Sequence, residues 1–492
     1  MQKLTTSIKK FSNFWFKSQS PYREPINFIK IDKLVIFMLC IVISIISSHK
    51  LLLPEQLSTE IISSWFLTFS EVLFCCGILI LIAQKENPMI NSRQIVLIIG
   101  LLFIVQAIKL NSSYLSPLSI IVPPALIISQ GMGTNTALAW VSIACINWPG
   151  NIDGLNNYLL LITFISSCVV SILGGKIRSR AQLLQISILV PFGAFLSQLF
   201  LIGGDNYKNT IIFTIQNKIL KSGDIFSDSF ILAILLLSTI LIMPIIESTF
   251  GLLTNARLLE LADQEKPLLR KLSIEAPGTF EHTLLICGLA EEATRMIGGN
   301  IDLIKTGALY HDIGKLHAPY WFIENQNGKN NPHDELNDPL ESARILQNHV
   351  DEGLRFARKY RLPKPIANFI PEHQGTLKMG YFLYKAKQSK IQFSEDNFRY
   401  NGPIPQSKET AILMLADGCE AALRAMDINA DDSEAMKTIS KIVTSREADG
   451  QLNESNLSKA EIFLIKRSFL NVWKRIRHRR IQYPTSKNNT FS

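Results

Sequence analysis

Apolar and polar positions divide the chain into two parts that meet near residue 252. From 32 to 251 long apolar runs alternate with short polar segments, whereas the remainder has the mixed pattern of a soluble domain. A helix needs about 20 apolar residues to cross a bilayer. Eight runs approach that length, at about 32–50, 61–83, 94–110, 117–130, 135–149, 157–175, 183–203 and 229–251. We therefore expect a multi-pass membrane protein.

The fourth and fifth runs are short and contain residues that interrupt helices. Pro123 and Pro124 lie inside the first of them, and Gly131 and Gly133 separate it from the second. Proline removes a helical hydrogen bond and kinks the helix. The pair is thus expected to form two tilted spans or one re-entrant hairpin, which gives a membrane domain of about seven or eight spans over 32–253.

The second part of the chain has helical periodicity. From about 279 to 483 apolar residues recur at spacings of three and four, without sustained alternation. Ser458 and Glu461 form a capping box that opens a last amphipathic helix. We predict an all-α fold: a basic tail at 1–31, the transmembrane helical domain at 32–253, a helical domain at 254–485 and a short tail at 486–492.

Basic residues predict the orientation in the membrane. They cluster in the tail 1–31, in the loop 84–93 and in the loop 174–182. Cytoplasmic loops carry an excess of Lys and Arg, so the N-terminus and the domain 254–485 are both expected in the cytoplasm. The stretch 204–228 then lies outside, where its isoleucines have the spacing of an interfacial helix.

Composition agrees with this division and narrows the function. The chain of 492 residues is 47% hydrophobic and 18% charged, with a mean hydropathy of +0.19. These values exclude an ordinary soluble enzyme and a disordered chain. The net charge of +9 is modest, and the basic cluster 474–480 ends an amphipathic helix rather than lining a groove. No nucleic-acid polymer is expected as a partner.

Histidine is concentrated in one part of the chain. Six of the eight histidines lie between 282 and 373. His311 and Asp312 are adjacent, so they offer a nitrogen ligand and a carboxylate that can bridge two cations, and Lys315 follows where it could meet a phosphate. Asp417 lies in an apolar helix, where an unpartnered carboxylate is costly. Candidate metal ligands in this helical domain are His282, His311, Asp312, His349, His373, Gln374 and Asp417.

These residues and the strings around them resemble the HD-domain phosphohydrolases. More narrowly, they resemble the seven-transmembrane HD family, whose studied members hydrolyse cyclic di-AMP. The matching strings lie at 276–282, 310–315, 320–326, 331–334, 372–376, 398–403 and 480–484. The membrane part is similar in architecture more than in motif, and the extracytoplasmic domain usual between the family's first two spans is lacking.

The resemblance implies a role for each candidate. One metal would be bound by His282, His311, Asp312 and Asp417. Asp312 would bridge to a second metal, whose further ligands would be His349 and His373. The two divalent ions, manganese or iron, would acidify a shared water, and the resulting hydroxide would attack the phosphodiester in line.

Three further positions complete the expected site. The family has a second histidine where this chain has Gln374, and an amide oxygen is a weaker ligand than imidazole, so the second metal should be held more loosely or be manganese. Lys315 is the candidate phosphate clamp, with a solvated helix lysine as the alternative. His333 either contacts substrate or supports a ligand, with a structural histidine as the alternative.

The expected function is that of a membrane-anchored phosphodiesterase that cuts cyclic di-AMP to pApA, in the bacterial inner membrane. Its partners would be the cyclic dinucleotide, membrane lipid and an unknown membrane or external signal, and homo-oligomerisation is left open. Alternatives are an HD hydrolase of another signalling nucleotide, a weakly catalytic nucleotide-binding receptor, and a transporter. The absence of a Gly-Tyr-Pro string after the HD pair argues against cyclic di-GMP.

Overall fold

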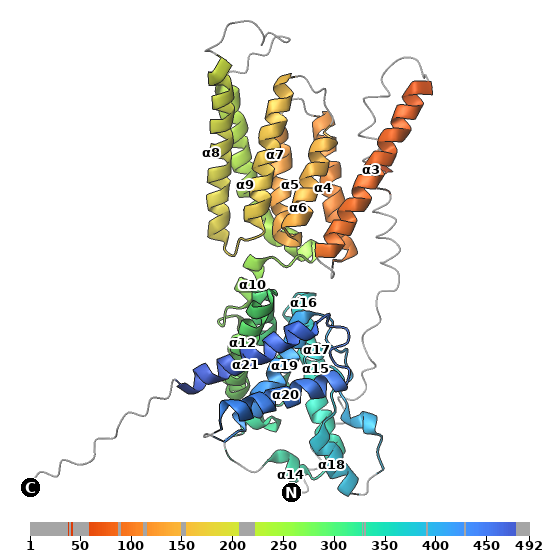
Figure 1. The fold of residues 1–492 in the computed structure, drawn as a ribbon, viewed down its shortest axis with the longest axis vertical. Coiled ribbons are helices and arrows are strands. Elements are labelled where there is room, and N and C mark those ends of the chain that lie inside the picture. The colour runs from red at the N-terminus through yellow and green to blue at the C-terminus, as the bar shows by residue number, and fades with distance from the viewer. Residues whose placement is uncertain are drawn as a thin grey trace, which may run out of the picture. The chain divides into compact units, whose positions relative to one another are not determined.

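The computed structural model is built from helices in the part of the chain that it describes. The described residues are 38, 41–42, 59–86, 90–111, 116–148, 154–205, 222–326, 328, 331–389, 392–427 and 430–478. Within these ranges every regular element is an α-helix or a 3-10 helix, apart from one isolated bridge between Lys378 and Arg399. The prediction of an all-α fold is confirmed. The chain separates into two compact units, 1–252 and 253–492 (Figure 1).

The first unit, the membrane unit, is a bundle of long apolar helices. Its described helices are α3 (Thr59–Glu86), α4 (Ser92–Asn111), α5 (Pro117–Met132), α6 (Thr134–Ile146), α7 (Gly154–Gly174), α8 (Arg180–Asp205) and α9 (Ser222–Phe250). The segments 180–200 and 225–250 are long and apolar enough to cross a membrane, yet only 39% and 28% of their most apolar windows are buried. A core helix of a soluble protein would bury more of its surface, so these apolar faces suit contact with lipid.

The two short apolar runs form a helical hairpin. Helices α5 and α6 pack against each other and meet at Gly133, whose φ of 107° is outside the range that other residues favour. The Glu86 side chain accepts hydrogen bonds from the backbone N–H groups of Asn135 and Thr136 at the start of α6. At 1.5 Å per residue both helices are shorter than about 25 Å, less than the roughly 30 Å of a bilayer core.

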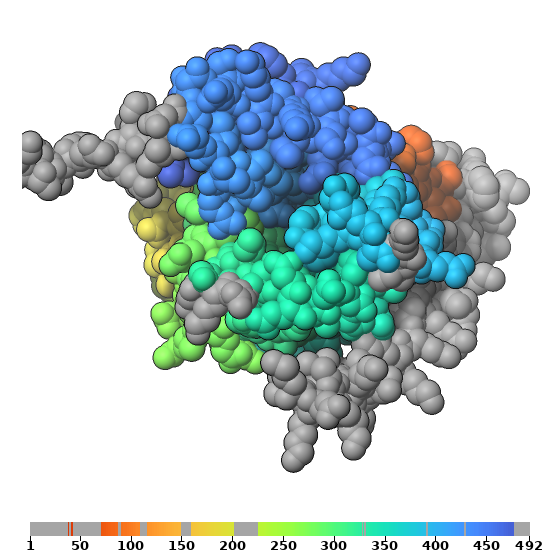
Figure 2. Space-filling model, turned by 90° about the horizontal axis from the view of Figure 1, so that it is seen from below, coloured from red at the N-terminus to blue at the C-terminus, as the bar shows by residue number. Residues whose placement is uncertain are grey.

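The second unit, the helical unit, is built from shorter helices. Its α-helices are α10 (Asn255–Leu261), α11 (Pro267–Glu275), α12 (Pro277–Ile297), α13 (Ile301–Tyr310), α14 (Pro332–Leu336), α15 (Pro339–Lys359), α16 (Lys364–Ala367), α17 (Phe369–Glu372), α18 (Gly380–Gln388), α19 (Lys408–Arg424), α20 (Asp432–Ala448) and α21 (Lys459–His478). Its 3-10 helices are η2 (Ile313–His317), η3 (Pro319–Trp321), η4 (Ile323–Asn325) and η5 (Glu395–Phe398). Figure 2 shows one face of this unit, on which green-to-teal and blue segments that are far apart in the sequence lie side by side.

Helix α12 lies at the centre of the helical unit, against α13, α19 and α21. Ile286 and Ala290 of α12 are fully buried in the same core as Ile465 and Phe469 of α21. The capping box that opens α21 is confirmed, because Ser458 and Glu461 exchange side-chain hydrogen bonds with each other's backbone N–H groups.

Some sequence predictions concern residues that the structure does not describe. They are the basic tail 1–31, the first apolar run apart from residues 38 and 41–42, the middle of the external stretch at 206–221, and the C-terminal tail. These lie outside the described residues and stay predictions.

Candidate metal centre

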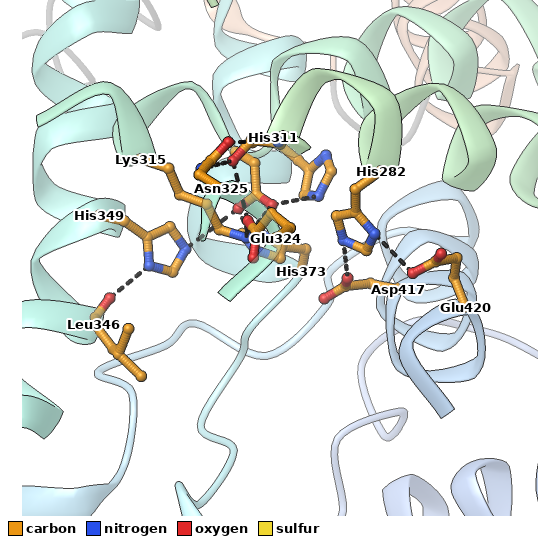
Figure 3. A network of polar contacts seen from close by, with 12 residues as sticks. His282, His311, Lys315, Glu324, Asn325, Leu346, His349, His373, Asp417 and Glu420 are labelled. Atoms are coloured by element: carbon orange, nitrogen blue, oxygen red, sulfur yellow. Dashed lines mark hydrogen bonds and ion pairs between the residues drawn. The ribbon is translucent and has the colours of Figure 1, made fainter. Parts of the chain in front are cut away.

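Five separate segments of the helical unit bring the predicted ligands together (Figure 3). His282 is on α12, His349 on α15 and Asp417 on α19, while His311 and Asp312 directly follow α13 and His373 directly follows α17. The ligand atoms of His282, His311 and Asp417 lie within 4.8 Å of one another, and so do those of His311, Asp312 and His373. His311 belongs to both groups, so they form one continuous site.

The segment that carries the His-Asp pair lies directly on α15. A side chain at Gly314 would place its Cβ only 1.7 Å from the His349 carbonyl oxygen, so only glycine permits this approach. Helix α13, which precedes the pair, is fixed by Tyr310, whose hydroxyl donates to the Leu261 carbonyl oxygen at 2.9 Å. The close backbone approach at Gly314 and the hydrogen bond of the Tyr310 side chain therefore set the position of the pair.

Asp312 is at the centre of the cluster. Its Oδ1 lies 3.6 Å from Nε2 of His349 and 3.6 Å from Nε2 of His373. Its Oδ2 lies 3.2 Å from Nε2 of His311. The carboxylate is buried and faces three imidazole nitrogens from two sides, which is the arrangement of a ligand that can serve two cations.

Three imidazoles are oriented by the backbone. Nδ1 of His311 lies 2.6 Å from the Ala308 carbonyl oxygen, Nδ1 of His349 2.6 Å from that of Leu346, and Nδ1 of His373 3.0 Å from that of Phe369. An Nδ1–H that donates to a carbonyl leaves the Nε2 lone pair free toward the cluster.

The same atoms test whether a metal fits. Nε2 of His311, of His349 and of His373 is buried without a hydrogen-bond partner, and so is Oδ1 of Asp312. Buried polar atoms normally have partners, and these four converge on one region. A set of imidazole nitrogens and carboxylate oxygens is what divalent transition metals bind, so these residues could hold metal.

His282 lies between two carboxylates of α19. Its Nε2 is 3.1 Å from Oδ1 of Asp417, and its Nδ1 is 2.7 Å from Oε2 of Glu420. Burial lowers the pKa of His282, but the two carboxylates more than offset this and raise it to about 9. Glu420 thus orients the ring so that Nε2 faces the cluster. For His349 burial dominates and lowers the pKa to about 3, so that imidazole is neutral.

Lys315 is part of this site and is not a solvated helix lysine. Its Nζ lies 2.8 Å from Oδ2 of Asp312 and 2.7 Å from Oε1 of Glu324. Burial lowers the pKa of Lys315, but the two carboxylates raise it well above its usual value. Burial by itself raises the pKa of Asp312, but the ammonium group of Lys315 and the neighbouring His311 bring it well below its usual range. The acid and the lysine are both charged.

Two predicted site residues, His333 and Gln374, are not among the residues of the ligand cluster described above. The His333 ring packs between Trp321 and Phe382, with ring centroids 5.1 Å apart in each case, and its Nε2 is 3.0 Å from the Trp321 carbonyl oxygen. Among the described residues no such contact joins His333 to the cluster. Gln374 directly follows His373 in the turn after α17 and is half-buried. The roles of both stay predictions.

Two buried acids at the site, Glu420 and Glu324, were not predicted from the sequence. Glu420 is three residues after Asp417, so the two share one face of α19, and this spacing was a usable signal. Glu324 lies in η4, nine residues after Lys315, and its approach depends on a series of 3-10 turns. Nothing in the sequence string 320–326 indicated that Glu324 would pair with Lys315.

Comparison with known proteins supports this architecture in both units. Residues 62–254 match the model of a 7TM receptor with intracellular HD hydrolase, and residues 279–422 match that of the HD domain. The two regions together span more than half of the chain. With the two span-length helices, these matches make the chain a membrane protein.

Relatives with curated sequences cover different shares of the chain. The cyclic-di-AMP phosphodiesterase PgpH of Bacillus subtilis is 34% identical over 417 residues, which is 82% of this chain and 57% of that protein. PgpH of Listeria monocytogenes is 39% identical over 246 residues, 50% of this chain and 34% of that protein. An uncharacterized protein of Synechocystis is 48% identical over 248 residues, 49% of this chain and 30% of that protein.

The chain thus spans between 30% and 57% of the length of these relatives. The crystal structure of the L. monocytogenes PgpH HD domain in complex with cyclic di-AMP is 36% identical and covers 44% of this chain and 99% of its own, at a TM-score of 0.42. By its membrane and HD matches, the chain belongs to the family of seven-transmembrane receptors with an intracellular HD hydrolase domain.

Proposed function

We propose that this protein is a membrane-anchored, metal-dependent phosphodiesterase that hydrolyses cyclic di-AMP to pApA. The observation that carries the proposal is the position of Asp312, whose two oxygens lie opposite the Nε2 atoms of three histidines. The names of two relatives support the substrate, since both are cyclic-di-AMP phosphodiesterases.

The ligands divide into two sets that share one carboxylate. His282, His311, Asp312 and Asp417 would hold one divalent ion, and Asp312, His349 and His373 would hold a second. Two such ions, manganese or iron, would supply Lewis acidity and an activated water for attack at phosphorus. The chain itself provides three imidazoles whose Nδ1 atoms face backbone carbonyl groups, and it places the buried Asp312 carboxylate beside them.

Lys315 would contact the substrate phosphate. An ammonium group has three N–H donors, and Asp312 and Glu324 can accept two of them. The third is available to a non-bridging phosphate oxygen. A fixed positive charge at this place lowers the cost of the charge that develops on the phosphate during hydrolysis.

The proposal is tested by turnover of the purified full chain. Cyclic di-AMP, cyclic di-GMP and guanosine tetraphosphate are supplied separately with Mn²⁺, and we expect hydrolysis of cyclic di-AMP to be fastest, with pApA as product. If another nucleotide is hydrolysed faster, that nucleotide and not cyclic di-AMP is the substrate. Binding of cyclic di-AMP without turnover would favour the receptor, an alternative that the departure at Gln374 specifically supports.

The metal preference of the second site can be tested at Gln374. Replacing it in Gln374→His would add an imidazole beside His373, and we expect at least about tenfold tighter binding of the second metal, or about 1.4 kcal/mol. Preference should shift from manganese toward iron, and turnover should rise most at low metal concentration. Metal stoichiometry and metal-dependent turnover measure this. If neither changes, residue 374 does not contribute to the second site.

We also infer an orientation with the N-terminus and the helical unit in the cytoplasm, and placement in a bacterial inner membrane. Reporters fused after Lys30, near Arg178 and at the C-terminus are expected to report the cytoplasm, because these segments follow the positive-inside rule. A fusion near Asn206 is expected to report the opposite side. A cytoplasmic signal from that fusion would overturn the orientation.

A further inference from the structure

Three of the strings singled out in the sequence meet at one network of hydrogen bonds and ion pairs beside the metal centre; Figure 3 labels its members Lys315, Glu324 and Asn325. They are the start of α12 at Gly278 and Thr279, the segment with Asp312 and Lys315, and the 3-10 turn η4 with Glu324 and Asn325. Only Asp312 among these six residues is a proposed ligand. Metal ligation therefore does not explain why the other residues of this network are held together.

Glu324 is held firmly in this network. Its Oε1 accepts a hydrogen bond from the Thr279 hydroxyl at 3.0 Å. The neighbouring Asn325 accepts from the Thr279 backbone N–H at 3.1 Å and donates to the Thr279 hydroxyl oxygen at 2.9 Å. A Cβ at Gly278 would lie 1.9 Å from the Glu324 carbonyl oxygen, so glycine is needed for η4 to approach α12. The Thr279 hydroxyl and the close approach of η4 to α12 at Gly278 thus set the position of the carboxylate.

The fixed carboxylate shares one lysine with the central ligand. Lys315 Nζ lies 2.7 Å from Oε1 of Glu324 and 2.8 Å from Oδ2 of Asp312, so the ammonium group is placed between two acids. The side chains of the three residues are only 12%, 8% and 2% exposed for Lys315, Glu324 and Asp312 respectively. Water therefore screens this arrangement little.

If Asp312 binds metal, Asp312 and Glu324 have different roles. A cation that pairs with a ligand carboxylate competes with the metal for its charge. Were Glu324 uncharged, Asp312 would be the nearest anionic partner of Lys315 among the described residues, and the ammonium group would move onto it. With Glu324 charged, the lysine is held by a carboxylate that is not a ligand.

We propose that Glu324 is a positioning residue that holds Lys315 between itself and Asp312, and so keeps the Asp312 carboxylate available to metal. The inference rests on the proposed function, since it assumes that Asp312 is a ligand. It adds a residue outside the ligand set whose effect on metal binding passes through Lys315.

A double-mutant cycle on the full chain tests this. The dissociation constant for Mn²⁺ is measured by calorimetry for the unsubstituted protein, Glu324→Gln, Lys315→Met and the double variant. We expect Glu324→Gln to weaken Mn²⁺ binding about tenfold when Lys315 is present and less than about twofold in the Lys315→Met background, because coupled residues are non-additive. Lys315→Met alone should tighten Mn²⁺ binding, since it removes a cation beside the ligand.

Two further variants separate positioning from folding and from general charge. Glu352→Gln is the matched control, because Glu352 is buried on α15 but pairs with Arg355 rather than with Lys315, and its Mn²⁺ affinity should stay within about twofold. Glu324→Asp retains the charge and should recover most of the affinity that Glu324→Gln loses. Thermal unfolding of each variant shows whether it is folded.

The outcomes distinguish this inference from the proposed function. Equal effects of Glu324→Gln in both backgrounds, or no effect in either, would overturn the positioning role. So would a folded Glu324→Asp protein that is as weak as Glu324→Gln. An unsubstituted protein that binds no Mn²⁺ would overturn the proposed function, and the inference with it.

Discussion

Asp312→Ala is expected to abolish hydrolysis of cyclic di-AMP and to lower the bound metal, because Asp312 is the one carboxylate that faces both ligand sets. Turnover should fall by at least about 10³-fold, equivalent to about 4 kcal/mol of transition-state stabilisation. The fold should survive. Lys315 keeps Glu324 as a partner at 2.7 Å, so no uncompensated charge is buried. Turnover and metal content of the purified full chain measure the effect.

The matched control for this variant is Asp334→Ala. Asp334 is an exposed acid of the same unit that pairs with Lys385, and its removal should leave turnover and metal content unchanged. Asp312→Ala protein with normal turnover would show that Asp312 is not a shared ligand. Lost turnover with two metals still bound would instead restrict Asp312 to orienting the substrate or the water.

The residues of the candidate site could be proposed from the sequence, but the groups that orient their side chains could not. His282, His311, Asp312, His349, His373 and Asp417 were all singled out, because histidines are concentrated in this part of the chain and an acid inside an apolar helix is costly without a partner. What orients them was not visible. The carbonyl groups that face three of the Nδ1 atoms come from the same helical turns, but this depends on side-chain rotamers that periodicity does not encode.

Contacts between distant segments were also beyond sequence reasoning. Gly314 is needed because the His349 carbonyl lies 1.7 Å from where its Cβ would be, and 35 residues of chain separate the two. Glu324 reaches Lys315 through consecutive 3-10 turns, which have no strong apolar period. The positions of the helices and of the apolar membrane segments follow from the local sequence pattern. Which side chains pair in a buried polar network depends instead on tertiary packing.

Removal of metal is expected to have a second large effect, on stability as well as on activity. A chelator should abolish turnover, because without its cations the proposed site has no Lewis acid to activate the attacking water. Mn²⁺ added back at about 100 times its dissociation constant should stabilise the folded helical unit by about 2.7 kcal/mol. For a unit of this size the unfolding midpoint should rise by about 5–10 °C. Differential scanning calorimetry of the full chain with and without Mn²⁺ measures this.

The expected stabilisation has a specific origin. Nε2 of His311, His349 and His373 are buried without hydrogen-bond partners, so the cations that bind these atoms relieve a desolvation cost that the folded protein otherwise bears. Mg²⁺ should stabilise much less, because it prefers oxygen ligands to imidazole. In Asp312→Ala the Mn²⁺ shift should shrink to a small fraction. An equal shift with both ions, or an undiminished shift in Asp312→Ala, would place the metal elsewhere in the chain.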